Sequence, residues 1–187
     1  MPLCIVVRAV FVLGLMMPSA ALAAPILIPT SGGASQVNDA EPIGQSFTAE
    51  DSLVSAGLWF RAINPGVPNT DPLEYRLHEG SGTGGALLAS STFHLATGFA
   101  GFHHVDFSAV SLVVGNVYSL VALVDGTSPY WAVGTSAADY PGGTLILSGA
   151  PLAVLDLALS VVPTAVPEPA SMGLLALGLG VLIFRRR

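Results

Sequence analysis

Apolar and polar side chains alternate along several short stretches of the sequence, and this alternation constrains the fold more than any other feature. Leu58, Phe60 and Ala62 share one phase, while Trp59 and Arg61 take the other. A period of two places each set on one face of an extended strand, so such stretches predict half-buried antiparallel strands. The same pattern recurs at residues 73–78, 104–107 and 155–161.

Glycine and proline residues interrupt these stretches roughly every ten residues, as in all-β domains. No long stretch shows the spacing of apolar residues that is typical of a helix. The sequence therefore predicts an all-β fold: a single antiparallel β-sandwich of jelly-roll kind. The stretch 117–124 is apolar on both faces except for Ser119, which indicates a central strand. Strands are expected at 43–48, 53–63, 72–79, 86–95, 101–107, 110–114, 117–124, 129–134, 143–148 and 153–161, after an irregular lead-in at 25–42.

Composition limits the partners of this domain, which we assign to residues 24–162. The chain is 52% hydrophobic and only 10% charged, unlike disordered proteins. Residues 24–162 carry two arginines against eleven acids, a net charge of −9, which repels phosphate backbones and argues against nucleic acid as a partner. The single cysteine is Cys4, so the domain has no disulfide and no thiolate metal site.

The first 23 residues have the composition of a secretory signal peptide. Arg8 precedes a short apolar stretch at 9–17, which a proline and small residues follow. The small residues Ala21 and Ala23 predict cleavage after Ala23, or one residue later, following export through the Sec translocon. The alternative, an uncleaved anchor helix, is disfavoured because the apolar stretch is short.

The C-terminus combines a proline-rich stalk at 163–169, an apolar run at 170–184 and three terminal arginines. As a helix, the apolar run spans about 22 Å, less than the roughly 30 Å of a bilayer's hydrocarbon core. Residues 170–187 are therefore expected to form a short transmembrane helix that anchors weakly, with the arginines on the cytoplasmic side. An enzyme outside the membrane could then reach the Pro-Glu-Pro tripeptide.

This arrangement over about residues 165–187 resembles the PEP-CTERM sorting signal, also called the ice-binding-protein C-terminal domain. The resemblance implies recognition by exosortase, a membrane cysteine protease-transpeptidase. It also implies a Gram-negative host that makes exopolysaccharide, a transient inner-membrane intermediate, and a final place at the cell surface or in the matrix. A plain tail anchor is the alternative. The implied recognition motif is Pro167, Glu168 and Pro169, and the implied retention cluster is Arg185, Arg186 and Arg187.

The rhythm of residues 43–124 also resembles extracellular β-sandwich domains that precede such signals. An ice-binding role would require flat arrays of threonine, which the sequence does not show.

Motifs for catalysis are weak, and we expect no enzymatic activity. Residues 80–85 satisfy G-x-G-x-x-G, but a Ser/Thr-rich stretch follows where a dinucleotide site needs a helix, so a flexible hairpin loop is expected. His78-Glu79 begins the zinc-protease motif, but Gly82 stands where its second histidine belongs. A triad of scattered residues stays open.

Two histidines could face each other if residues 92–95 and 102–107 form a hairpin. His94 would then lie opposite His104, and the two imidazoles could share a metal ion or a proton, with Asp106 as the obvious third ligand. Solvated surface histidines are the other interpretation, and we predict no metal site. His103 has the phase of the apolar residues and is expected to be buried and hydrogen-bonded.

Oxygen-rich segments leave a structural calcium ion open, although no EF-hand loop is present. The candidates are Asn38, Asp39 and Glu41 in one segment, and Glu50 and Asp51 in another. No other cofactor is expected.

Aromatic residues supply the candidate ligand-binding surface, because sugars stack their C–H faces on exposed rings. Trp59, Tyr130 and Trp131 are the candidates. The adjacent Tyr130 and Trp131 point in opposite directions, so only one can face solvent; alternatively, both tryptophans pack in the core. We expect an exported surface or exopolysaccharide-matrix protein with a structural or adhesive role. A carbohydrate-binding module and a hydrolase of unknown type are the alternatives.

Overall fold

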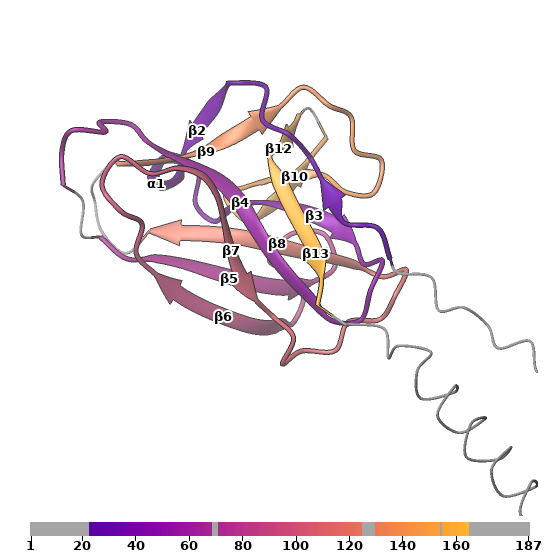
Figure 1. The fold of residues 1–187 in the computed structure, drawn as a ribbon. Coiled ribbons are helices and arrows are strands. Elements are labelled where there is room, and N and C mark those ends of the chain that lie inside the picture. Colours follow the sequence, from indigo (N-terminus) through magenta and orange to yellow (C-terminus); the bar gives the residue numbers. More distant parts are fainter. Residues whose placement is uncertain (1–22, 69–70, 125–129, 154, 165–187) are drawn as a thin grey trace, which may run out of the picture.

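The computed structural model describes residues 23–68, 71–124, 130–153 and 155–164. Within these ranges the chain forms two antiparallel β-sheets that pack face to face, with one four-residue helix (Figure 1). The predicted all-β sandwich is thereby confirmed. The predicted signal peptide at 1–23 and the predicted C-terminal helix at 170–187 lie outside the described residues, apart from residue 23.

Each sheet is built from strands that are distant in sequence. The first sheet has the order β1 (Ile26–Leu27), β13 (Leu159–Pro163), β4 (Val54–Ala62), β9 (Trp131–Ser136) and β12 (Asp156–Leu157), with β2 (Ala34–Gln36) on β9 and β7 (Ala100–Asp106) on β4. The second sheet has the order β11 (Ala150–Leu152), β10 (Leu145–Leu147), β3 (Ile43–Thr48), β8 (Val117–Val124), β5 (Leu73–Glu79) and β6 (Leu87–Phe93). The short helix α1 spans Val37–Ala40.

The alternating pattern places the apolar phase in the core, as predicted. Leu58 and Phe60 on β4 are fully buried, as are Leu73, Tyr75 and Leu77 on β5. The prediction that 117–124 forms a central strand is also confirmed, because β8 pairs with β3 on one side and with β5 on the other.

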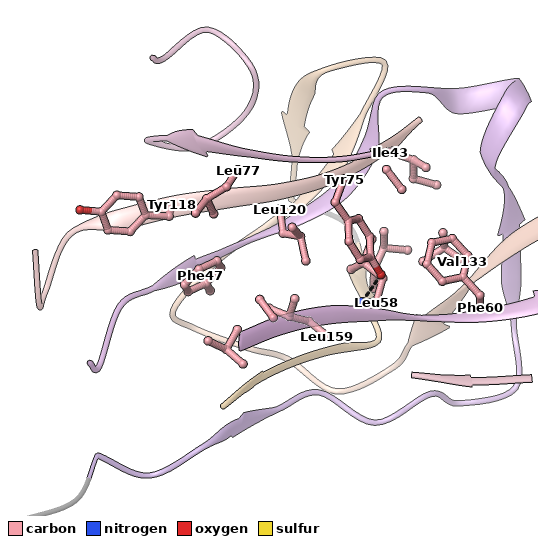
Figure 2. Packing of buried hydrophobic residues seen from close by; sticks show 14 of the residues in the cluster. Ile43, Phe47, Leu58, Phe60, Tyr75, Leu77, Tyr118, Leu120, Val133 and Leu159 are labelled. Carbon is pink, nitrogen blue, oxygen red and sulfur yellow. Dashed lines mark hydrogen bonds between the residues drawn. The ribbon is translucent and has the colours of Figure 1, made fainter. Parts of the chain in front are cut away.

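Tyr75 crosses the core from the second sheet to the first (Figure 2). Its hydroxyl accepts a hydrogen bond from the Leu58 amide at 2.8 Å and donates one to the His103 carbonyl at 3.0 Å. The hydroxyl therefore bridges two backbone groups, one on β4 and one on β7, that belong to residues paired in the strand register.

Three predictions about strands are wrong. Residues 110–114 belong to the connection between β7 and β8, where the Leu112 amide bonds to the Ser52 carbonyl instead of to a sheet. The stretch 153–161 is divided between β12 and β13, which pair with different partners. The lead-in at 25–42 contains β1, β2 and α1. In the described part of the chain, no helix has the length and apolar character needed to cross a bilayer.

Candidate aromatic binding face

Trp59 lies on the outer face of the first sheet, where its ring is partly exposed. It is on β4, in register with Phe102 on β7, and directly paired residues of antiparallel strands point to the same face. Phe102 is also partly exposed. Trp59 and Phe102 are therefore direct cross-strand neighbours on a surface that the core does not use.

Gly134 on β9 supports the ring of Trp59 from the other side. A Cβ atom at Gly134 would lie 2.7 Å from Cε3 of Trp59 and 3.0 Å from Oγ1 of Thr30. Only a residue without a side chain leaves the indole room to lie against the strand. One side of the indole is thus packed on backbone, which holds the ring in place.

Polar groups flank the two rings. His104, two residues after Phe102 on β7, is exposed, and its ring centroid lies 6.0 Å from that of Phe102. Although His104 is exposed, desolvation by neighbouring groups lowers its pKa below the usual value, so its imidazole is mostly neutral at pH 7 and offers one donor and one acceptor. The exposed Arg61 projects from the same face of β4. We call Trp59, Arg61, Phe102 and His104 the aromatic face.

The other predicted ligand-binding aromatics lie elsewhere. Trp131 is only 2% exposed, and its indole Nε1 has no hydrogen-bond partner among the described residues. Trp131 is therefore a core residue, and its ring cannot stack on a sugar. Tyr130 is partly buried and packs against the same core. Of the three candidates, Trp59 alone retains a place on the outer face of a sheet.

The hairpin that would place His94 opposite His104 does not form. β6 pairs with β5 in the second sheet and β7 pairs with β4 in the first, so residues 94–99 cross between the sheets and do not close a hairpin. His103, expected to be buried, is half-buried, and its ring stacks on Phe93 with centroids 4.1 Å apart. Burial, and to a lesser degree the neighbouring His104, lowers the pKa of His103.

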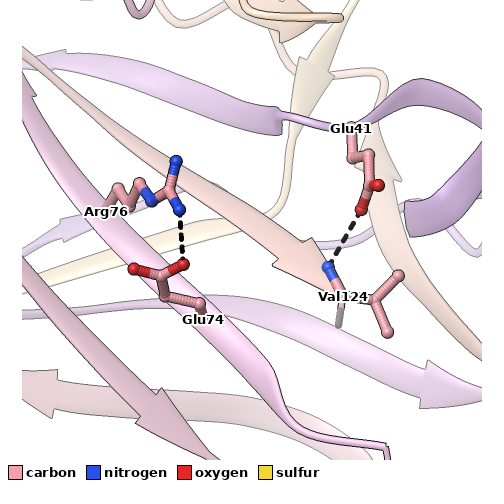
Figure 3. Close-up of polar contacts among 4 residues, drawn as sticks. All are labelled: Glu41, Glu74, Arg76 and Val124. Carbon is pink, nitrogen blue, oxygen red and sulfur yellow. Dashed lines mark hydrogen bonds and ion pairs between the residues drawn. The ribbon is translucent and has the colours of Figure 1, made fainter. Parts of the chain in front are cut away.

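Two of the acidic residues considered for calcium accept hydrogen bonds from backbone amides, whereas the buried Asn38 Oδ1 has no hydrogen-bond partner among the described residues. Glu41 Oε2 accepts a hydrogen bond from the Val124 amide at 3.0 Å (Figure 3), and Asp51 Oδ1 accepts one from the Leu53 amide at 3.1 Å. Within the described ranges, no three His, Cys, Asp or Glu side chains lie close enough to share a metal ion. The same figure shows Glu74 paired with Arg76. The two side chains are 2.7 Å apart, and the pairing lowers the pKa of the Glu74 carboxyl.

The glycine-rich loop at 80–85 is held by the protein itself. The Gly80 amide bonds to the Val117 carbonyl, the Gly82 amide to the Ser119 hydroxyl at 2.8 Å, and the Thr83 amide to the Gly149 carbonyl. These donors are not free to bind a phosphate, and strand β6 follows where a nucleotide site needs a helix. The predicted hairpin is confirmed, although its loop is braced against neighbouring turns.

A polar connection between the sheets was not predicted. Gln45 on β3 is fully buried and donates from Nε2 to Asp156 Oδ1 at 2.7 Å. The Leu157 amide donates to Gln45 Oε1, and the Tyr140 amide donates to Asp156 Oδ2. Both carboxylate oxygens therefore have structural partners. A cavity of about 230 Å³ next to Asp156 is lined by small and polar residues, among them Ser136, Asp139 and Thr144.

The sequence did not single out Phe102, which belongs to the aromatic face, or Gly134, which supports the ring of Trp59. Alternation gives the phase of Phe102, but its place beside Trp59 depends on strand pairing, which no local pattern encodes.

Comparison with known families identifies the C-terminal segment. Residues 165–187 match the model of the PEP-CTERM protein-sorting motif. No curated protein matches the chain. The motif implies export, processing by exosortase and a destination at the cell surface.

Proposed function

We propose that this chain is a surface or exopolysaccharide-matrix protein of a Gram-negative bacterium, whose single jelly-roll-like sandwich adheres to polysaccharide through the aromatic face. In this proposal the signal peptide and the sorting tail deliver the sandwich, and the sandwich does the binding. The role is adhesive and structural, and involves no catalysis.

One observation supports the proposal above all others: the indole of Trp59 is packed on Gly134 on an outer sheet face, and its residue is in register with Phe102. A ring held in this way loses little conformational freedom on binding, which favours affinity. Pyranose rings present C–H groups on one face, and these pack on an aromatic ring, while neighbouring polar groups bond to hydroxyls. The exposed Arg61 and the neutral imidazole of His104 can supply such bonds.

The absence of catalysis is part of the proposal. It is supported by the hydrogen bonds that the buried Asp156 already makes within the protein. Asp156 is a buried carboxylate beside a cavity, but its two oxygens accept hydrogen bonds from Gln45 and Tyr140. A general acid or base must instead reach a substrate proton.

Affinity electrophoresis through gels that contain exopolysaccharide of the host, or a panel of neutral and acidic polysaccharides, tests the proposal. We expect at least one polysaccharide to retard the protein, and Trp59→Ala and Phe102→Ala each to weaken the retardation at least fivefold. Leu87→Ala is a matched control, because Leu87 is 53% exposed on β6 of the other sheet.

Tryptophan fluorescence provides a second readout. In the variant Trp131→Phe, Trp59 is the only tryptophan left, so polysaccharide binding should change its emission. Unchanged emission across the panel, together with equal retardation of Trp59→Ala and the unmodified protein, would refute glycan binding by this face.

A further inference from the structure

We infer that the end of the sandwich from which β13 leaves rests on the lipid bilayer while the sorting tail is still attached. We call this end the exit end; it comprises residues 49–54, 107–117 and 163–164. The contact is made by valine side chains at the tip of the β7–β8 connection, and its partner is the interface of a membrane whose headgroups carry no net charge.

Hydrogen bonds place the β7–β8 connection beside the point where the chain leaves the domain. The Thr164 amide bonds to the Leu53 carbonyl at 2.9 Å, at the start of β4. The Leu112 amide bonds to the Ser52 carbonyl at 2.8 Å, and the Gly115 amide to the Ala49 carbonyl at 2.8 Å. The segment 49–53 therefore lies between the chain exit and the β7–β8 connection, in agreement with the arrangement in Figure 1.

Exposed apolar side chains gather at this end. Val113 and Val114 are each 60% exposed, Val117 is 37% exposed and Val162, next to the exit, is 40% exposed. At the opposite end, beyond the last residue of β4, Val67 is the one large hydrophobic residue of comparable exposure among those described. The remaining exposed large hydrophobic residues among those described are spread over β1, β6, β11 and the residue before β12: Leu27, Leu87, Leu152 and Leu155.

The tip of the connection is a braced turn. The Asn116 amide bonds to the Val113 carbonyl at 3.1 Å, and Gly115 has a φ of +88°, the left-handed conformation that such a turn requires. The Tyr118 hydroxyl accepts a hydrogen bond from the Val113 amide at 2.8 Å. These bonds hold both valines outward, so they need no reorganisation to meet a surface.

The length of the remaining chain brings this end to the membrane. The sorting motif begins at residue 165, directly after Thr164, and residues 165–169 span no more than about 18 Å even when fully extended. This step depends on the apolar run at 170–184 entering the bilayer. Once it does, the short tether gives the valines a high effective concentration at the interface, so a weak apolar contact is sufficient.

Charge at the same end selects the kind of lipid. Glu50 is exposed at this end, and so is Asp106, which directly precedes residue 107; hydrogen bonds from Ser108 lower the pKa of the Asp106 carboxyl, which keeps it ionised. Two carboxylates near a membrane are repelled by anionic headgroups. Contact should therefore be closer on phosphatidylcholine than on a bilayer rich in phosphatidylglycerol.

Fluorescence quenching of the full chain in nanodiscs, at one copy per disc, tests the inference. A fluorophore is attached at Ser111→Cys near the valines or, as a control, at Thr97→Cys at the far end, with Cys4 changed to serine in both. Vesicle flotation first establishes that the tail inserts. With phosphatidylcholine that carries a headgroup-proximal nitroxide, we expect at least threefold stronger quenching at position 111 than at 97.

Variants distinguish membrane contact made by the valines from the proximity that the inserted tail alone produces. Val113→Asp with Val114→Asp should reduce the quenching at 111 to the level at 97, whereas Val67→Asp should leave it unchanged. If circular dichroism shows that the double variant does not fold, Val114→Ser should give a smaller loss in the same direction. Equal quenching at 111 and 97 after confirmed insertion would overturn the inference, as would failure of the tail to insert or quenching that appears only with two copies per disc. None of these results depends on polysaccharide binding.

Discussion

Gln45 and Asp156 join the two sheets through a buried hydrogen bond of 2.7 Å between Nε2 and Oδ1. The pair lies 111 residues apart in sequence, on β3 and β12. The Leu157 amide bonds to Gln45 and the Tyr140 amide to Asp156, so the pair also fixes two segments of backbone near the edge of the sandwich.

Asp156→Ala should destabilise the sandwich by about 2–4 kcal/mol, because it leaves the Gln45 amide group and the Tyr140 amide buried without acceptors. Urea unfolding of the mature protein measures the change, and the exposed Glu50→Ala is the control. A double-mutant cycle with Gln45→Ala should give a coupling energy above about 1 kcal/mol. A loss of less than 0.5 kcal/mol in Asp156→Ala, in the range of ordinary surface substitutions, would contradict the role assigned to the pair.

Tyr75→Phe should cost about 2 kcal/mol, because the Leu58 amide and the His103 carbonyl both lose the hydroxyl that satisfies them. Chemical denaturation at pH 7 measures this loss. If the variant is as stable as the unmodified protein, water must have replaced the hydroxyl, and the bridge is not needed.

Tyr75 should also make the stability of the fold depend on pH in alkaline solution. Burial raises the pKa of Tyr75 well above its ordinary value of 10.0, so the unfolded chain releases this proton more easily than the folded chain. The stabilisation is present in full below about pH 10 and is lost as the pH rises above it. Between pH 9 and 11, stability should fall more steeply in the unmodified protein than in Tyr75→Phe; parallel curves would count against this explanation.

His103 should make the protein sensitive to mild acid. Burial lowers its pKa below the ordinary value of 6.5, with a smaller effect from His104, so folding disfavours the protonated ring. This contribution is complete above about pH 6.5 and is lost as the pH falls toward the folded-state pKa. His103→Phe, which retains a ring against Phe93, should flatten the dependence between pH 7 and 5. An NMR titration that places the pKa of His103 at or above 6.5 would disprove the assignment.

Gly134→Ala should displace the indole of Trp59, because the added Cβ would lie 2.7 Å from it. The cost in stability should be about 1–3 kcal/mol, typical of overpacking, and the emission of Trp59 in a Trp131→Phe background should shift to longer wavelength as the ring moves into water. Gly66→Ala, in an open loop where a Cβ meets nothing within 4 Å, is the control. An unshifted spectrum would mean that the glycine does not position the ring.

The alternation of apolar and polar residues predicted the buried residues more accurately than the pairing of the strands. Leu58, Phe60 and Tyr75 are in the core as their phase requires. Phase carries no information about pairing, however, so a hairpin between residues 92–95 and 102–107 stayed possible, although β6 and β7 in fact belong to opposite sheets. The residues of the aromatic face come together only through that pairing.

Breaks in phase explain the other errors. Leu155 shares the apolar phase of Leu157 and is nevertheless 52% exposed, while Asp156, in the polar phase, is buried. The register that places a carboxylate opposite a buried glutamine depends on a contact across the sandwich, which alternation along one strand cannot reveal.

The central claim is that the C-terminal segment is a sorting signal that the cell removes. Intact mass spectrometry of the protein recovered from its host tests this claim most directly. We predict that the protein at the cell surface or in the matrix begins near Ala24 and lacks residues 170–187, and that mutation of the Pro-Glu-Pro motif leaves the uncut form in the inner membrane. A surface-exposed protein whose mass still includes residues 170–187 would contradict the account.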